Sequence, residues 1–132
     1  MGAFGFNVFE NDDALDWVDE YRTSGGAGMI QNALNTALSA GYLEIPEAST
    51  GLAAAEFVAV LNFCPSTDLD PGVAQVAQSR KVLLTEELLR KAQSAVTRIK
   101  NDSELAQEWN AVDPDGGAWS QALDDLIARL DV

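Results

Sequence analysis

Apolar residues recur along most of the chain at the three- and four-residue spacing of amphipathic helices. Near the N-terminus they occupy one face of a predicted helix over about residues 11–22: Ala14, Trp17, Val18 and Tyr21. The clustered glycines of residues 23–28 then favour a loop. A second apolar stripe predicts a helix from about residue 30 to Gly41, where the glycine is expected to end the helix in a left-handed conformation.

Residues 46–61 predict a helix of another kind, because the stretch from Leu52 to Leu61 is apolar on every side apart from Glu56. Between Leu52 and Leu61, Glu56 is the one charged residue. A helix without a polar face is typical of one that is buried between other helices. Pro46 fits its first turn, where no backbone N–H donor is needed.

The carboxylate of Glu56 requires an explanation in such a helix. Burying it alone is too costly, so it is either half-exposed at a seam between helices or buried and paired. Six of the eight basic residues lie between positions 80 and 100, and Arg90 and Arg98 are the expected partners. A structural ion pair is the first interpretation, and a functional carboxylate is the alternative.

Capping residues predict further helices in the second half of the chain. Asp70 followed by Pro71 suits the start of a short helix, and Thr85 suits the N-cap of a longer one. Asn101 and Glu104 have the spacing of a capping box for the next helix. The last helix carries a continuous apolar stripe: Trp119, Ala122, Leu123, Leu126, Ile127 and Leu130.

These patterns predict an all-α fold, with residues 1–132 forming a single-domain bundle of about six helices. An extended Gly/Phe-rich N-terminal arm precedes the first helix, and its phenylalanines are expected to fill grooves of the bundle. Asn11 then serves as the N-cap of that helix. Only residues 2–9 and 81–84 are candidates for a strand, and both are short.

Charge restricts the possible functions more than hydrophobicity does. The net charge is −13, and it is uneven: residues 1–70 hold eleven acidic side chains against Arg22, whereas residues 71–132 hold ten against seven basic ones. So acidic a chain repels phosphate backbones, and no nucleic-acid partner is expected. No window is apolar enough to span a membrane and no secretory signal is visible, so a cytoplasmic protein without a membrane partner is expected.

The residue types also exclude most catalytic chemistry. The chain has no histidine, which removes imidazole bases, imidazole metal ligands and the usual nucleophile pairs. Cys64 is the only cysteine, and its place at the end of an apolar helix predicts a packed, unreactive thiol. We therefore expect no catalytic residue, no metal and no cofactor, and enzymatic activity stays uncertain, with the balance against it.

Carboxylates are the remaining candidates for a site. Five of them project from the polar side of the first helix and form a candidate partner-binding surface: Asp12, Asp13, Asp16, Asp19 and Glu20. Helix-dipole interactions favour acidic residues in a first turn, which is sufficient to explain Asp12 and Asp13 but not the other three. A solvated acidic face is the plain interpretation. A site for a hard cation, using Glu10, Asp12, Asp13, Asp16 and Glu56, is the alternative.

Four segments of the chain are distinctive: "MGAFGFNVFENDDALDW", "YLEIPEASTGLAAAEFVAVL", "SELAQEWN" and "AWSQALDDLIARL". With them the chain resembles the bacterial domain-of-unknown-function family 4259, and the resemblance covers most of its length. One departure is Phe4, where tryptophan would be usual in the family. The resemblance implies a small bacterial protein of this type, and it brings no activity or catalytic residues with it.

The combined hypothesis is a non-enzymatic binding protein that uses its acidic N-terminal half against a basic partner protein. An immunity-type inhibitor, which covers the cationic active site of a toxin, is one concrete form. The alternative is a carboxylate-dependent metal-binding protein or enzyme. The sequence leaves the oligomeric state open.

Overall fold

The computed structural model describes residues 8–112 and 117–131, which form seven helices and no strand. The helices are α1 (Asp12–Ser24), α2 (Ala27–Ser39), α3 (Ile45–Leu61), α4 (Pro71–Gln78), α5 (Glu86–Asn101), α6 (Glu104–Val112) and α7 (Gly117–Arg129). The predicted all-α class is confirmed, with one helix more than the expected six or so. Most of the predicted N-terminal arm lies outside the described residues, and 81–84 is not a strand.

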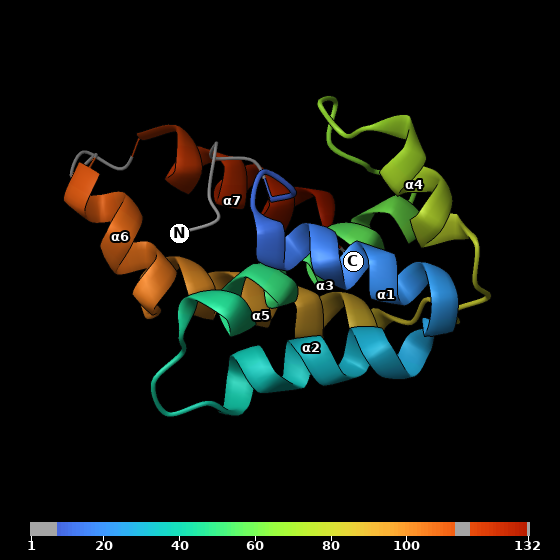
Figure 1. Cartoon of the computed structure of the whole chain (residues 1–132), viewed down its shortest axis with the longest axis horizontal. Helices are drawn as coiled ribbons and strands as arrows, with labels where there is room; N and C mark the ends of the chain where they lie inside the picture. The colour runs from blue at the N-terminus through green and yellow to red at the C-terminus, as the bar shows by residue number, and fades with distance from the viewer. Residues whose placement is uncertain (1–7, 113–116, 132) are drawn as a thin grey trace.

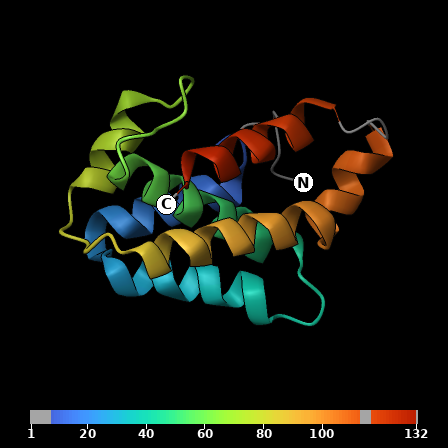
Figure 2. The same cartoon turned by 180° about the vertical axis from the view of Figure 1, so that it is seen from behind.

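Helix α3 lies at the centre of the bundle and contacts each of the other helices (Figure 1). This position explains why its sequence has no polar face: every residue from 51 to 60 is buried. Gly51 allows close packing there, since a Cβ at that position would lie 3.1 Å from Ala37 Cβ and 3.1 Å from Ile99 Cδ1. Seen from behind, α5 runs between α2 and α7 and contacts both (Figure 2).

An aromatic cluster fixes α1 against α3. The rings of Trp17 and Tyr21 pack on Phe57, with centroid separations of 5.0 and 4.9 Å and edge-to-face geometry. Phe9 contacts Phe57 from a second side, at 6.0 Å. Because this inner face holds the helix, the opposite face of α1 is left to solvent.

Two predicted N-caps are confirmed. Ala14 N donates to Asn11 Oδ1 at 2.8 Å, and Leu88 N donates to Thr85 Oγ1 at 3.0 Å. Asp70 also occupies the N-cap position of α4, but its side chain makes no capping hydrogen bond.

Two other predicted helix ends are wrong. The chain leaves α2 through Ala40 in an extended conformation rather than through a left-handed Gly41. The predicted capping box also fails, because Asn101 belongs to the end of α5 and Ser103 caps α6 instead, with Ala106 N donating to Ser103 Oγ at 3.0 Å. Glu104 accepts a hydrogen bond from Ile45 N at 3.0 Å and so ties α6 to the start of α3.

Candidate functional site

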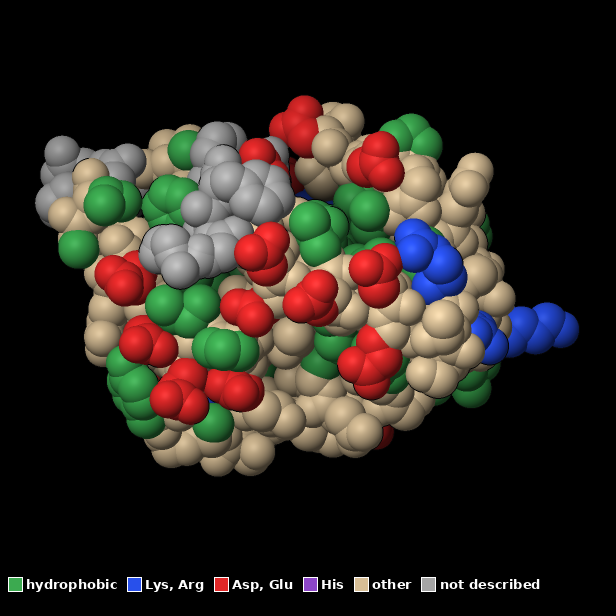
Figure 3. Space-filling model, in the orientation of Figure 1, with side chains coloured by type: hydrophobic (Ala, Val, Ile, Leu, Met, Phe, Trp, Pro, Cys, Tyr) green, Lys and Arg blue, Asp and Glu red, His purple; other side chains and the backbone are tan. Residues whose placement is uncertain are grey.

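The predicted acidic surface lies on the outer face of α1. Asp12, Asp16, Asp19 and Glu20 are exposed, and Asp13 is partly buried. In Figure 3, acidic side chains are spread over α1, with further ones above it on the segment that leads to α4. The prominent basic side chains of this view lie towards one edge of the face.

Within that surface the described contacts are sparse. Asp19 Oδ1 accepts a hydrogen bond from Arg22 Nη1 at 2.8 Å, in a pair whose side chains are 69% and 59% exposed. Such an exposed pair contributes little to stability. Asp12 and Asp13 lie in the first turn of α1, as expected. Across residues 8–112 and 117–131, no three carboxylate or thiol side chains converge as metal ligands, so the structure offers the cation-site alternative no support.

Glu56 is buried and paired, but its partner is neither of the predicted arginines. The Glu56 side chain is 2% exposed. Arg129 of α7 forms a bidentate ion pair with it, in which Nη1 donates to Oε2 at 2.7 Å and Nη2 donates to Oε1 at 2.9 Å. Ser66 N donates to the same Oε2 at 3.2 Å. Arg129 also donates from Nε to Asp125 Oδ2 at 2.8 Å and from Nη1 to Cys64 O at 3.0 Å.

The predicted partners have other roles. Arg90 pairs with Glu86 on the exposed side of α5. Arg98 turns towards the end of α2, where it donates to the carbonyl oxygens of Ala37 and Ala40 at 2.8 and 2.7 Å. Arg90 and Arg98 are the partners expected from the sequence, because most basic residues lie between positions 80 and 100. The partner is instead Arg129, 73 positions from Glu56 in the sequence.

The Glu56–Arg129 pair joins α3 to α7 and lines a pocket. Burial by itself would lower the pKa of Arg129, but the hydrogen bonds and charges of Glu56 and Asp125 outweigh it and raise that pKa. The guanidinium is therefore permanently charged and held by two carboxylates. Glu56 is fully engaged in structure, which favours the structural interpretation of this residue over the functional one.

The pocket above this pair has a volume of about 750 Å³. Its walls come from residues 8–10 and Leu15 at the N-terminal end of α1, Glu56 of α3, residues 66–70, the first turn of α4 and one side of α7. Apolar side chains that include Phe9, Leu15 and Val73 line it. Among the described residues that line it, one is a cation, Arg129, and five are carboxylates: Glu10, Glu56, Asp68, Asp70 and Asp125. The pocket is therefore a negatively charged recess with apolar walls.

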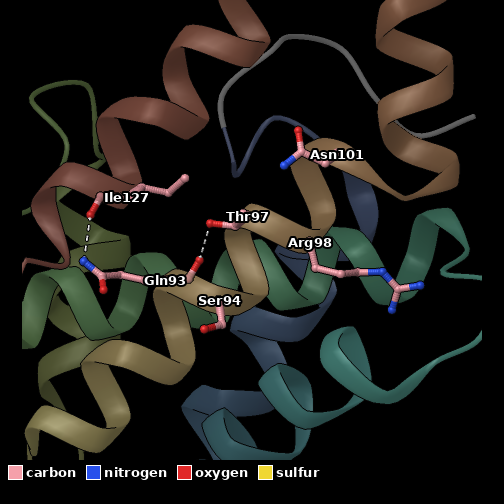
Figure 4. Close-up of a pocket in the computed structure, with 6 residues that line it drawn as sticks. All are labelled: Gln93, Ser94, Thr97, Arg98, Asn101 and Ile127. Atoms are coloured by element: carbon pink, nitrogen blue, oxygen red, sulfur yellow. Dashed lines mark hydrogen bonds between the residues drawn. The ribbon is translucent and has the colours of Figure 1, made fainter.

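A second hollow, of about 500 Å³, lies between α5 and α7 (Figure 4). Two hydrogen bonds engage part of its lining: Gln93 Nε2 donates to Ile127 O at 3.4 Å, and Thr97 Oγ1 donates to Gln93 O at 2.9 Å. Arg98 points away from it, towards α2. The other polar side chains of the lining belong to Ser94 and Asn101.

The end of α3 differs from the prediction. Phe63 N donates to Val60 O and Cys64 N donates to Ala59 O, at 3.0 and 2.9 Å, which closes the helix in a Schellman turn. Phe63 takes the left-handed position with φ of 61°, where glycine is usual, and its side chain is 91% exposed. Cys64 lies beyond the turn and is exposed, so the predicted packed thiol is wrong.

The chain matches a known protein family over most of its length. Residues 2–122 match the family described as "Domain of unknown function (DUF4259)". The chain belongs to the DUF4259 family. The matched range includes the acidic surface of α1 and Glu56, while Arg129 follows it. No curated protein and no solved structure matches this DUF4259 chain. No helix in the part of the chain that the structure describes is long and apolar enough to cross a membrane.

Proposed function

We propose that this protein is a non-enzymatic binding protein whose acidic α1 surface engages a basic partner protein. One observation carries the proposal: the exposed carboxylates of α1 are not required by the packing, which uses the opposite face of that helix. Charge of one sign gathered on one face speeds association with an oppositely charged partner. An immunity-type inhibitor of a cationic enzyme is one form of this function.

The distribution of cations supports the proposal. Arg98 and Arg129, with side chains only 16% and 15% exposed, are held by bonds within the fold. Lys100 pairs with Asp124 at 2.5 Å. These cations do not offset the negative field over α1, where Arg22 is the one basic residue of the helix.

Affinity capture with matched variants tests this function. Wild-type protein is expected to retain a basic protein at low salt and to release it at high salt, because exposed charges are screened. The variant D16N/D19N/E20Q should lose that protein. The control variant E44Q/E87Q/E108Q, which removes the same charge elsewhere, should keep it. Equal retention by the two variants would contradict a role for α1, and no basic protein at low salt would contradict the function.

A further inference from the structure

The pocket of about 750 Å³ beside α1 combines two features that the acidic surface lacks: depth and apolar walls. Its volume lies within the range of ligand sites, roughly 300–1,000 Å³. Phe9, Leu15, Leu69 and Val73 provide the apolar lining. Figure 3 shows a recess above α1, with acidic side chains at its margin, on the same face as the acidic surface.

The charges around the pocket exclude an anionic ligand. Among the described residues of the lining, Arg129 is the only cation, and it is already held by Glu56 and Asp125. Asp68 and Asp70 add two further negative charges to the lining. Asp70 is notable because it stands at the N-cap of α4 without making a capping hydrogen bond, so its carboxylate is not used by that helix.

The carboxylates of the pocket do not gather as the ligands of one metal ion. Among the described residues, no three of them form a group that could hold a metal. Separate carboxylates around an apolar recess suit an extended organic cation, which can meet different acceptors with different N–H groups. The planar guanidinium of arginine, with five donors and a stem of methylene groups, has this form. Phe9 adds an aromatic ring to the lining, and aromatic faces attract guanidinium groups.

We propose that this pocket receives an arginine side chain of the basic partner, with its methylene stem against Leu15 and Val73 and its guanidinium at Asp68 and Asp70. The inference rests on the proposed function and deepens it. The α1 surface attracts a basic protein, and the pocket selects one that presents an arginine at the right place. Specificity thus comes from the pocket and the rate of encounter from α1.

Two tripeptides that differ in one charge provide the test. Acetyl-Leu-Arg-Leu amide is titrated into isotopically labelled protein, and so is the same peptide with citrulline, which has nearly the shape of arginine but no charge. The arginine peptide should shift the amide signals of Leu15, Leu69 and Val73 saturably. The citrulline peptide should bind at least about ten-fold more weakly, since the carboxylates then lose a charged partner. Equal affinity of the two peptides would overturn the proposal.

Variants separate the pocket from the α1 surface. D68N/D70N should weaken binding of the arginine peptide about ten-fold, whereas E87Q/E108Q, with the same loss of charge elsewhere, should leave it nearly unchanged. Asn also remains acceptable at the N-cap of α4, so the fold should persist. If the arginine peptide shifts no pocket signal, or D68N/D70N binds it as wild type does, the pocket proposal fails. The proposed function is judged separately, by the loss of the captured protein in D16N/D19N/E20Q.

Discussion

In α5 and α7 the main cationic side chains are bonded into the fold, whereas the acidic side chains of α1 face solvent. Arg129 makes four hydrogen bonds to Glu56, Asp125 and Cys64. Arg98 closes the end of α2 through three carbonyl oxygens, at 2.7 to 3.0 Å. On α1, by contrast, the ion pair between Asp19 and Arg22 is largely exposed.

The difference separates charges that the fold needs from charges that it merely tolerates. Breaking a buried pair leaves an uncompensated charge in the interior, which costs about 3–5 kcal/mol. Repulsion between exposed carboxylates at neighbouring positions of a helix costs only a few tenths of a kcal/mol. Folding therefore leaves Asp16 and Glu20 free to serve another purpose, and this supports a binding role for that surface.

The largest effect is expected from Arg129→Met. The change leaves Glu56 buried, with Ser66 N as its one remaining described hydrogen-bond donor. We expect the free energy of unfolding to fall by about 3–5 kcal/mol. Urea unfolding followed by circular dichroism measures it.

The double variant Glu56→Leu/Arg129→Met provides the control. Replacing both members of a buried pair by apolar residues is often nearly neutral. The double variant should therefore recover most of the lost stability. If Arg129→Met alone costs less than about 1 kcal/mol, which is typical of an exposed pair, Arg129 is not a buried structural cation and the comparison with α1 breaks down.

Arg98→Ala should lower the free energy of unfolding by less, about 2 kcal/mol. The three carbonyl oxygens at the end of α2 can then accept some hydrogen bonds from water instead. Arg98→Lys should recover only part of the loss, since an ammonium group does not reproduce the planar fork of the guanidinium. Thermal unfolding of both variants checks this order. Equal stability of Arg98→Ala and wild type would show that the bonds are not required.

Sequence alone predicts the elements whose signals are local. The apolar face of α1, the N-cap Thr85 and the all-round apolar helix α3 each depend on residues within one helix, and each is confirmed. The predicted capping box at Asn101 is wrong for a local reason, because α5 continues through Asn101 and Ser103 caps α6. The predicted end at Gly41 is wrong because a distant contact decides it. Arg98 satisfies the carbonyls of α2 across 57–61 positions, so no glycine cap is needed there.

The candidate site divides in the same way. The acidic surface of α1 is a pattern within one helix, and it could be read from residues 12–20. The pocket is assembled from the start of α1, residues 66–70, α4 and α7, so no sequence motif marks it. The burial of Glu56 could be inferred from its apolar neighbours, but choosing Arg129 required the packing of α7 on α3.

Phe63→Gly is expected to stabilise the protein by about 1 kcal/mol. A left-handed conformation costs a residue with a Cβ roughly 1–2 kcal/mol, and the greater flexibility of unfolded glycine offsets part of the gain. Removing the ring loses almost no buried apolar surface, since Phe63 is 91% exposed. Phe63→Ala serves as the control and should stay near wild type in urea unfolding. A glycine variant less stable than wild type would show that the Phe63 ring stabilises the folded state.

Tyr21→Phe tests the inner face of α1. The Tyr21 hydroxyl is buried without a described hydrogen-bond partner, so its removal should be neutral or stabilise by up to about 1 kcal/mol. Desolvation raises the pKa of Tyr21, although the charge of Arg80 lowers it in part. Above pH 10 the unfolded state therefore ionises more readily than the folded state, and wild type loses stability as pH rises. Unfolding at pH 7 and 10.5 should show a smaller loss for Tyr21→Phe; an equal loss would contradict the buried hydroxyl.

Asp16→Asn/Glu20→Gln should have the smallest effect, a gain of a few tenths of a kcal/mol at low salt. The two carboxylates lie one turn apart on the exposed face of α1, and Asp16 also lies one turn from Asp12, so their removal relieves repulsion. Salt should erase the gain, because it screens exposed charges. Urea midpoints at about 10 mM and 1 M NaCl measure both effects. A loss of more than about 1 kcal/mol would exceed the range of exposed charge pairs, and it would mean that these carboxylates support the fold as Glu56 does.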